Sequence, residues 1–208
     1  MDMDIDIDII IKHLKEMLVD RGDNIDEFEE HESEIDRDEF FNDSKILEFH
    51  TSNSTIIFAM TKKLRKFILD ELKSEQDDIN NFVLKYNNKK NIILIFNNDI
   101  ISAPILQQIN KYDKIFQKNN GILQYFYAKQ LHFNPTKHSY VPKHIKITSK
   151  DEITKIMEEY LINTKTKLPL ILHTDPQAKW LGLKQGEIIK IERYNENSGL
   201  YYYYRCCI

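Results

Sequence analysis

The chain contains few of the residues that break or cross-link a fold. Its 208 residues include five glycines, five prolines and two cysteines. So little glycine and proline excludes collagen-like and linker-rich architectures. The cysteines, Cys206 and Cys207, are adjacent, which is neither a disulfide framework nor a zinc spacing. The sequence therefore predicts a fold without disulfides or structural metal.

Long hydrophobic runs are also missing. The apolar run at 92–96 is far shorter than the roughly 20 residues that a membrane span needs. The acidic N-terminus lacks the positive charge of a signal peptide. Hydrophobic residues nevertheless make up 41% of the chain and aromatic residues 11%, which is enough for a packed core. We expect a soluble intracellular protein with one large domain or two small ones.

Acidic and basic residues are unevenly distributed. The chain carries 33 Asp and Glu against 29 Lys and Arg, a net charge of −4. Residues 1–60 have a net charge of −13, whereas residues 61–208 have +9. The near-neutral total therefore describes neither part, and the basic part permits contact with nucleic acid.

Apolar spacing predicts alternating helices and strands over the first two thirds of the chain. A helix is expected over 1–21, with Gly22 as its C-cap. The segment 23–48 is so rich in acids that we expect a solvated helix or a mobile loop. A small α/β layer is predicted from about 50 to 133. Its expected elements are strands at 55–60, 91–96 and 121–127, helices at 61–73 and from 101 with Ser102 as N-cap, and a turn at 97–99.

A boundary is predicted near residue 134, because two prolines within eight residues favour extended chain. Beyond it, Ser149 and Glu152 form a capping box before a helix whose apolar stripe covers 153–161. Asp175 and Pro176 begin a second helix. Strands are expected at 168–172, 187–193 and 200–206, with a hairpin turn at 195–199. Two of the four tyrosines at 201–204 are expected in the core.

The search for a catalytic or metal site finds one weak pattern. Asp70, Glu71 and Lys73 match the Glu-x-Lys spacing of metal-dependent nucleases, but those enzymes project such groups from a sheet. Here the three residues end an amphipathic helix and are typical of its solvated face. The histidines at 132, 138 and 144 match no zinc pattern. We therefore predict no catalytic residue, metal or cofactor and no small-molecule substrate.

Several separate motifs in the last 75 or so residues share one order and spacing. They are Val141-Pro142-Lys143-His144-Ile145, Leu168-Pro169, the run from Thr174-Asp175-Pro176 through Trp180-Leu-Gly182 to Arg193, and Asn197-Ser198-Gly199 through Tyr204-Arg205. This part closely resembles the fifth-largest subunit shared by the nuclear RNA polymerases I, II and III, which has a counterpart in the archaeal RNA polymerase. Upstream, Asp20-Arg21-Gly22 and the strand 91–96 with Ser102-Ala103-Pro104 resemble the family in outline, although Pro104 follows Ser-Ala instead of preceding it.

The resemblance implies a two-domain α/β (α+β) protein. Residues 1–133 would form a nuclease-like α/β jaw domain without an active site. Residues 134–208 would form a small mixed α/β assembly domain that docks on the largest polymerase subunit. Trp180 and the tyrosines at 201–204 are candidate anchors, because Trp, Tyr and Arg dominate interface energetics. For Trp180, packing in the core is the equal alternative. The predicted assembly residues are Pro142, His144, Asp175, Pro176, Lys179, Trp180, Lys184, Arg193, Ser198, Gly199, Tyr204 and Arg205.

We therefore expect a non-catalytic subunit of a multisubunit DNA-directed RNA polymerase that shapes the downstream-DNA channel. Its partners would be the largest subunit, other polymerase subunits and downstream DNA, without a membrane. Ser102, Ala103, Lys111 and Lys114 would lie near DNA. An active metal-dependent nuclease and a free-standing basic DNA-binding module are the alternatives.

Heavy use of Ile, Asn and Lys is typical of an AT-rich genome, that of a large DNA virus or of a protist. The location would be the nucleus for a cellular enzyme, and the infected-cell cytoplasm or virion for a viral one. Residues 61–134 have a local charge of +5 beside the −13 segment. We predict a jaw with one basic face near DNA phosphates and one acidic face turned away, because salt screens charges beyond about 8–10 Å.

Overall fold

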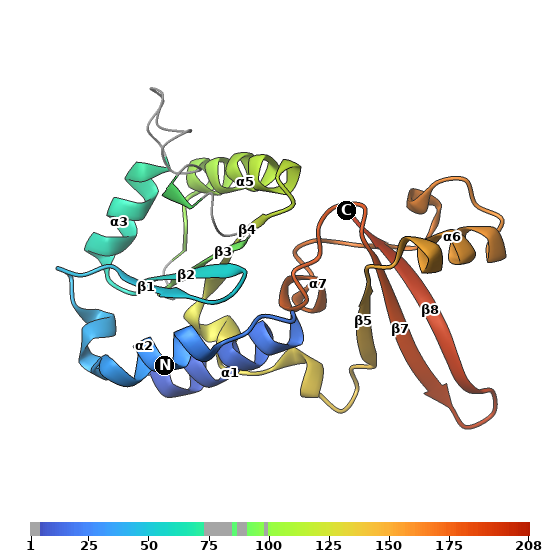
Figure 1. Cartoon of the computed structure of the whole chain (residues 1–208), viewed down its shortest axis with the longest axis horizontal. Coiled ribbons are helices and arrows are strands. Elements are labelled where there is room, and N and C mark those ends of the chain that lie inside the picture. The colour runs from blue at the N-terminus through green and yellow to red at the C-terminus, as the bar shows by residue number, and fades with distance from the viewer. Residues whose placement is uncertain (1–4, 73–84, 87–90, 98–99) are drawn as a thin grey trace. The chain divides into compact units, whose positions relative to one another are not determined.

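The computed structural model describes residues 5–72, 85–86, 91–97 and 100–208, and its chain divides into two compact units, Met1–Phe133 and Asn134–Ile208. The expected turn at 97–99 and Lys73 fall wholly or partly outside the described residues. In the described part of the chain, no helix is long and apolar enough to cross a membrane. Figure 1 shows the elements of each unit.

The first unit is built around a four-stranded sheet in the order β1-β2-β3-β4. Strands β2, β3 and β4 are parallel, and β1 adds an antiparallel edge. Alternate residues of each buried strand point to opposite faces, so both faces are apolar. The elements are α1 (Ile7–Asp20), α2 (Asp26–Glu34), η1 (Arg37–Phe41), β1 (Leu47–His50), β2 (Ser54–Ala59), α3 (Lys62–Glu71), β3 (Asn91–Phe96), α5 (Ala103–Lys118), β4 (Ile122–Tyr127) and η2 (Ala128–Leu131).

Helices cover both faces of this sheet (Figure 1). On one face, α3 and α5 pack on Ile57, Leu94 and Leu123. On the other, Phe28 of α2 contacts Phe49 at a ring-centroid distance of 4.8 Å, and Phe40 contacts Phe58 at 4.9 Å. The result is a three-layer α/β unit that confirms the predicted α/β layer.

The acidic segment 23–48 is ordered, so the expectation of a solvated helix or mobile loop was wrong in part. Its carboxylates do lie mostly on the surface, but Phe28 and Phe40 are 0% and 1% exposed. These two rings attach the segment to the sheet, and their burial stabilises it although its many acidic residues show no apolar stripe. The antiparallel strand β1 was also missed, because it is only four residues long and only half of them are apolar.

The turn after α1 explains the Asp20-Arg21-Gly22 motif. Gly22 has φ +82°, a conformation that glycine adopts most easily. Half-buried Arg21 donates to Gln124 Oε1 at 2.7 Å, and its partial loss of hydration lowers its pKa to about 10. Asp23 accepts hydrogen bonds from the Ser54 hydroxyl and, at 3.0 Å, from Thr51 Oγ1. The motif therefore joins the end of α1 to the sheet.

The second unit has its own four-stranded sheet, in the order β5-β7-β8-β6. Helix α6 covers one face through Ile156, and α7 covers part of the other through Ala178. Its elements are η3 (Pro135–Lys137), β5 (Lys143–Ile147), α6 (Lys150–Glu159), η4 (Lys165–Lys167), β6 (Leu170–Ile171), α7 (Pro176–Trp180), β7 (Ile188–Asn195) and β8 (Gly199–Cys207). With the first unit, it confirms a mixed α/β (α+β) chain with two sheets.

Most local signals of the second unit are confirmed. Ser149 caps α6 by accepting from Glu152 N, Asp175 caps α7 by accepting from Gln177 N, and Gly182 follows α7 with φ +59°. The stripe predicted at 153–161 was only partly right, because Leu161 is 93% exposed. The expectation that two of the four tyrosines at 201–204 are core was wrong, since none is buried.

Candidate functional site

The main candidate site is the face of the β5-β7-β8 sheet that α7 leaves partly open. Strand register places His144 beside Ile191 and Ile191 beside Tyr203, and it pairs Arg193 with Tyr201. Paired residues of neighbouring strands project from the same face. We call the group His144, Arg193, Tyr201, Tyr203 and Arg205 the hairpin face.

Tyr203 lies between two guanidinium groups on this face. Arg193 Cζ is 5.4 Å and Arg205 Cζ is 5.5 Å from the centre of its ring. Both distances lie within the roughly 6 Å of a cation–π contact. The two cations are thus held at the surface by a shared aromatic ring, where a partner's carboxylate could approach them.

Arg205 is the more constrained of the two arginines. Its Nη1 donates to the Leu170 carbonyl oxygen at 3.1 Å. Its Nε is buried and has no hydrogen-bond partner among the residues that the structure describes. A buried donor without a partner is costly in a folded protein. This unpaired donor is therefore a local cost of holding Arg205 against the sheet.

His144 is half-buried at the edge of the hairpin face, and its Nδ1 lies 2.6 Å from the Pro142 carbonyl oxygen. Burial lowers its pKa below the ordinary value of 6.5. The cations of Arg193 and Arg205 lower this pKa further, whereas the Pro142 hydrogen bond and the Asp175 carboxylate raise it. The balance favours a neutral imidazole.

The predicted assembly residues do not all share this face. Trp180 is 1% exposed, so of the two alternatives for this residue the anchor was wrong and the core position is confirmed. Tyr204 projects from the opposite face, where its ring lies 5.8 Å from that of Tyr160 on the α6 side. Tyr203, which was missing from the predicted set, takes the central place. The alternation of Arg193 and Arg205 with the tyrosines of a two-strand hairpin was the signal for it.

The other predicted assembly residues are spread around the second unit. Lys184 donates its backbone N–H to Glu187 Oε2 at 2.7 Å, in a turn. Gly199 has φ +71° in the hairpin connection next to exposed Ser198. The remaining four are half-buried Pro142, Asp175 and Lys179 and exposed Pro176, which lie before β5, at the N-cap of α7 or within α7.

The residues predicted to lie near DNA belong to the first unit and are all exposed. Ser102 is the N-cap of α5 but makes no side-chain cap bond, and Ala103 follows it at the start of the helix. Lys111 and Lys114 lie further along the same helix. The chain before α5 is fixed by a 3.0 Å bond from Ile101 N to Tyr127 Oη.

The charges of the first unit lie mainly on opposite sides of its sheet. The acidic helix α2 covers one face, whereas α3 and α5, each with more bases than acids, cover the other (Figure 1). Two bases of the acidic side are paired there: Lys15 with Glu32 at 2.9 Å, and Arg37 with Asp8 at 2.7 Å. One ion pair, Lys63 with Asp43 at 3.3 Å, links basic α3 to the acidic segment.

The structure gives the nuclease pattern no support. Asp70 and Glu71 lie on α3 rather than on the sheet. Among the residues that the structure describes, no three His, Cys, Asp or Glu side chains are placed to hold a metal ion.

Comparison with known proteins places similarity mainly in the second unit. The family model for the C-terminal domain of RNA polymerase Rpb5 matches residues 133–207. The DNA-directed RNA polymerase subunit Rpo5 of Pyrococcus abyssi is 43% identical over 81 residues, which are 39% of this chain and 96% of that protein. The same subunit of Pyrococcus horikoshii is 45% identical over 76 residues, 36% of this chain and 90% of that protein.

Proposed function

This chain belongs to the Rpb5/Rpo5 family of DNA-directed RNA polymerase subunits, and we propose that it docks on the largest subunit through residues 134–208. The observation that carries this proposal is the extent of the match. An 81-residue match covers 96% of the archaeal protein, so the shared part is about the size of the second unit. The part common to both proteins is the natural candidate for assembly with other subunits.

The hairpin face provides the docking chemistry. Arginine and tyrosine are enriched among the residues that dominate binding energy. A guanidinium binds a carboxylate with two parallel hydrogen bonds, and exposed Arg193 offers such a fork beside half-buried Arg205. Arg193, Tyr203 and Arg205 form the centre of the interface, with His144 and Asp175 at its edge. The other predicted assembly residues would form its outer contacts, apart from buried Trp180, which supports α7 from within, and Tyr204, which projects from the opposite face.

The first unit would act as a nuclease-like jaw that lies beside downstream DNA without cutting it. Its basic side, formed by α3 and α5, supports this role because Lys and Arg neutralise backbone phosphates without reading sequence. Ser102, Ala103, Lys111 and Lys114 would lie nearest the duplex. The compartment would be that of the enzyme, the nucleus for a cellular polymerase and the infected-cell cytoplasm or virion for a viral one.

Co-expression with the largest polymerase subunit of the same source tests the docking role. We expect the full chain and a chain lacking 1–133 to co-purify with that subunit, whereas a chain lacking 134–208 does not. The opposite pattern would overturn the assignment of roles to the two units.

The absence of catalysis is tested with the pure full-length protein, duplex DNA and either Mg²⁺ or Mn²⁺. We expect no cleavage. Cleavage that disappears in Glu71→Ala would establish the nuclease alternative.

A further inference from the structure

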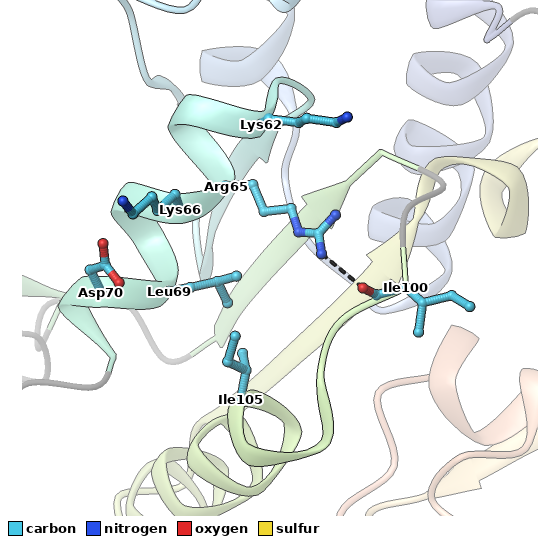
Figure 2. Close-up of a pocket in the computed structure, with 7 residues that line it drawn as sticks. All are labelled: Lys62, Arg65, Lys66, Leu69, Asp70, Ile100 and Ile105. Carbon is cyan, nitrogen blue, oxygen red and sulfur yellow. Dashed lines mark hydrogen bonds between the residues drawn. The ribbon is translucent and has the colours of Figure 1, made fainter.

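A hollow of about 560 Å³ opens in the first unit where α3 faces the chain that leads into α5 (Figure 2). Ligand sites typically have volumes of about 300–1,000 Å³. The lining residues are Lys62, Arg65, Lys66, Leu69, Asp70, Ile100 and Ile105. None of them belongs to the hairpin face or to the residues proposed to lie near DNA.

The hollow is electropositive. Lys62, Arg65 and Lys66 project from α3, and Asp70 is the one carboxylate among the described residues of the lining. Among the described residues, Lys62 and Lys66 have no carboxylate within 4.0 Å, and both are exposed. The described lining thus has three cations against one anion, a formal charge of about +2 that would attract an anionic ligand.

The same hollow has an apolar part. Leu69 and Ile105 are 5% and 8% exposed and form its inner wall. Ile100 stands at the rim with 87% of its surface exposed. Its carbonyl oxygen accepts a 2.8 Å bond from Arg65 Nη2, so the charged helix holds the apolar rim in place. Exposed isoleucine next to a concave basic surface marks a contact site better than scattered apolar residues do.

We infer that this hollow binds an acidic peptide segment of a partner protein, in which a large apolar side chain stands beside the carboxylates. The lysines would bind the carboxylates, and Leu69 and Ile105 would bury the apolar side chain. Ile100, whose side chain points away from these two in Figure 2, would contact the peptide at the rim. DNA would supply anionic phosphates but no apolar group for this wall, so a peptide fits the mixed lining better. The hollow lies on the basic side of the first unit, but it does not include Ser102, Ala103, Lys111 or Lys114, the residues proposed to lie nearest DNA.

The test uses the full-length protein and fluorescence anisotropy with three labelled probes. The first is a peptide of alternating Asp, Glu and Leu. Its length, about twelve residues, lets it span the hollow as an extended chain. The second replaces each Leu with Ala, and the third is a duplex DNA of random sequence. The variants are Lys62→Glu with Lys66→Glu, and Ile100→Ser. The matched control is Lys150→Glu with Lys155→Glu on α6, which makes the same charge change in the second unit.

We expect the Leu peptide to bind the wild type at least about tenfold more tightly than the Ala peptide. Charge reversal in the hollow should weaken binding of the Leu peptide about tenfold or more. Ile100→Ser should weaken binding of the Leu peptide but not binding of the Ala peptide. The α6 control should bind like the wild type, and circular dichroism should show that every variant is folded.

Three results would overturn the inference. Equal binding of the Leu and Ala peptides would mean that the hollow recognises charge alone. If the wild type binds no peptide and the Lys62/Lys66 variant loses DNA binding, the hollow is a phosphate site. Equal loss in the α6 control would mean that no specific hollow is involved. The first and third results leave the docking of 134–208 untouched, because co-purification with the largest subunit measures that role separately.

Discussion

The two units of this chain bury their apolar residues differently. In the first, both faces of the sheet are covered, and Phe28, Phe49 and Phe58 are at most 1% exposed. In the second, one helix covers each face in part, and Tyr194, Tyr201 and Tyr202 remain 75%, 40% and 45% exposed. A domain of this size rarely obtains more than about 3–5 kcal/mol from its own core. From this contrast we expect the first unit to be the more stable by itself and the second to gain more from the docking proposed above.

The two units also differ in how their charged side chains are bound. The first unit pairs an acidic layer with a basic one, and several of its ions are bound to each other, as Lys15 is to Glu32. On the hairpin face of the second unit, Arg193 and Arg205 both contact Tyr203. Cations held on an aromatic ring remain available for a carboxylate of another chain.

The strongest test of this contrast is Phe49→Ala in the aromatic cluster of the first unit. The ring contacts Phe28, Phe40 and Phe58, so the cavity should cost about 3–5 kcal/mol of unfolding free energy. Urea denaturation should show this loss in the transition of the first unit only. Phe67→Ala, at a site that is 48% exposed, is the control and should cost less than about 1 kcal/mol. Equal losses would remove the case for a self-sufficient first unit.

A double variant of the hairpin face, Arg193→Ala with Arg205→Ala, should mainly affect docking. We expect affinity for the largest subunit to fall roughly tenfold or more, because both cations are lost. Binding is measured by co-purification and by titration of the full-length protein. Lys150→Ala with Lys155→Ala on α6 is the matched control and should bind normally. Undiminished binding by the arginine variant would place the interface elsewhere on the second unit.

The stability of the second unit should depend on pH through the protonation of His144. Its folded pKa lies below its ordinary value of 6.5, so the unfolded chain takes up the proton first. This contribution to stability is present above pH 6.5, decreases as the pH falls through 6.5, and is fully lost below the folded pKa. Thermal unfolding between pH 8 and pH 5 should show a smaller decrease for His144→Gln than for the wild type. An identical decrease in both would exclude a role for this histidine.

The smallest effect is expected for the cysteines. Burial raises the pKa of Cys207 to about 11 and that of Cys206 in the same direction. At pH 8 only about one Cys207 thiol in a thousand is ionised, so labelling by a thiol reagent should be very slow in the native protein. Labelling should become fast in urea. Fast native labelling would show that the second unit opens when it lacks a partner.

Several elements could be predicted from the sequence because their signals are local. The strand 91–96 is continuously apolar after its first residue, and the structure begins and ends β3 at the same residues. Ser149 and Asp175 act as predicted at the starts of α6 and α7. Side-chain capping involves atoms two or three residues apart, so it needs no knowledge of the rest of the fold.

Other features could not be predicted because they depend on distant neighbours. Phe28 and Phe40 looked like isolated apolar residues in an acidic stretch until Phe49 and Phe58 were placed beside them. Leu161 continues the apolar stripe of α6, yet the helix ends at Glu159 and Leu161 takes φ +53° at the surface. The hollow on α3 joins residues that lie about 30 to 40 positions apart.

The sequence by itself determined the family, most strands and helices, and the two segments of opposite local charge. Those properties follow from the order of the motifs, the apolar periodicity and the composition, all of which can be read without knowing any tertiary contact. Only the tertiary structure decided that Tyr203 rather than Tyr204 stands between the arginines, that Trp180 is core, and that α3 forms a basic hollow with Ile100. Strand register and helix packing set which face a side chain occupies, and both depend on contacts between distant parts of the chain.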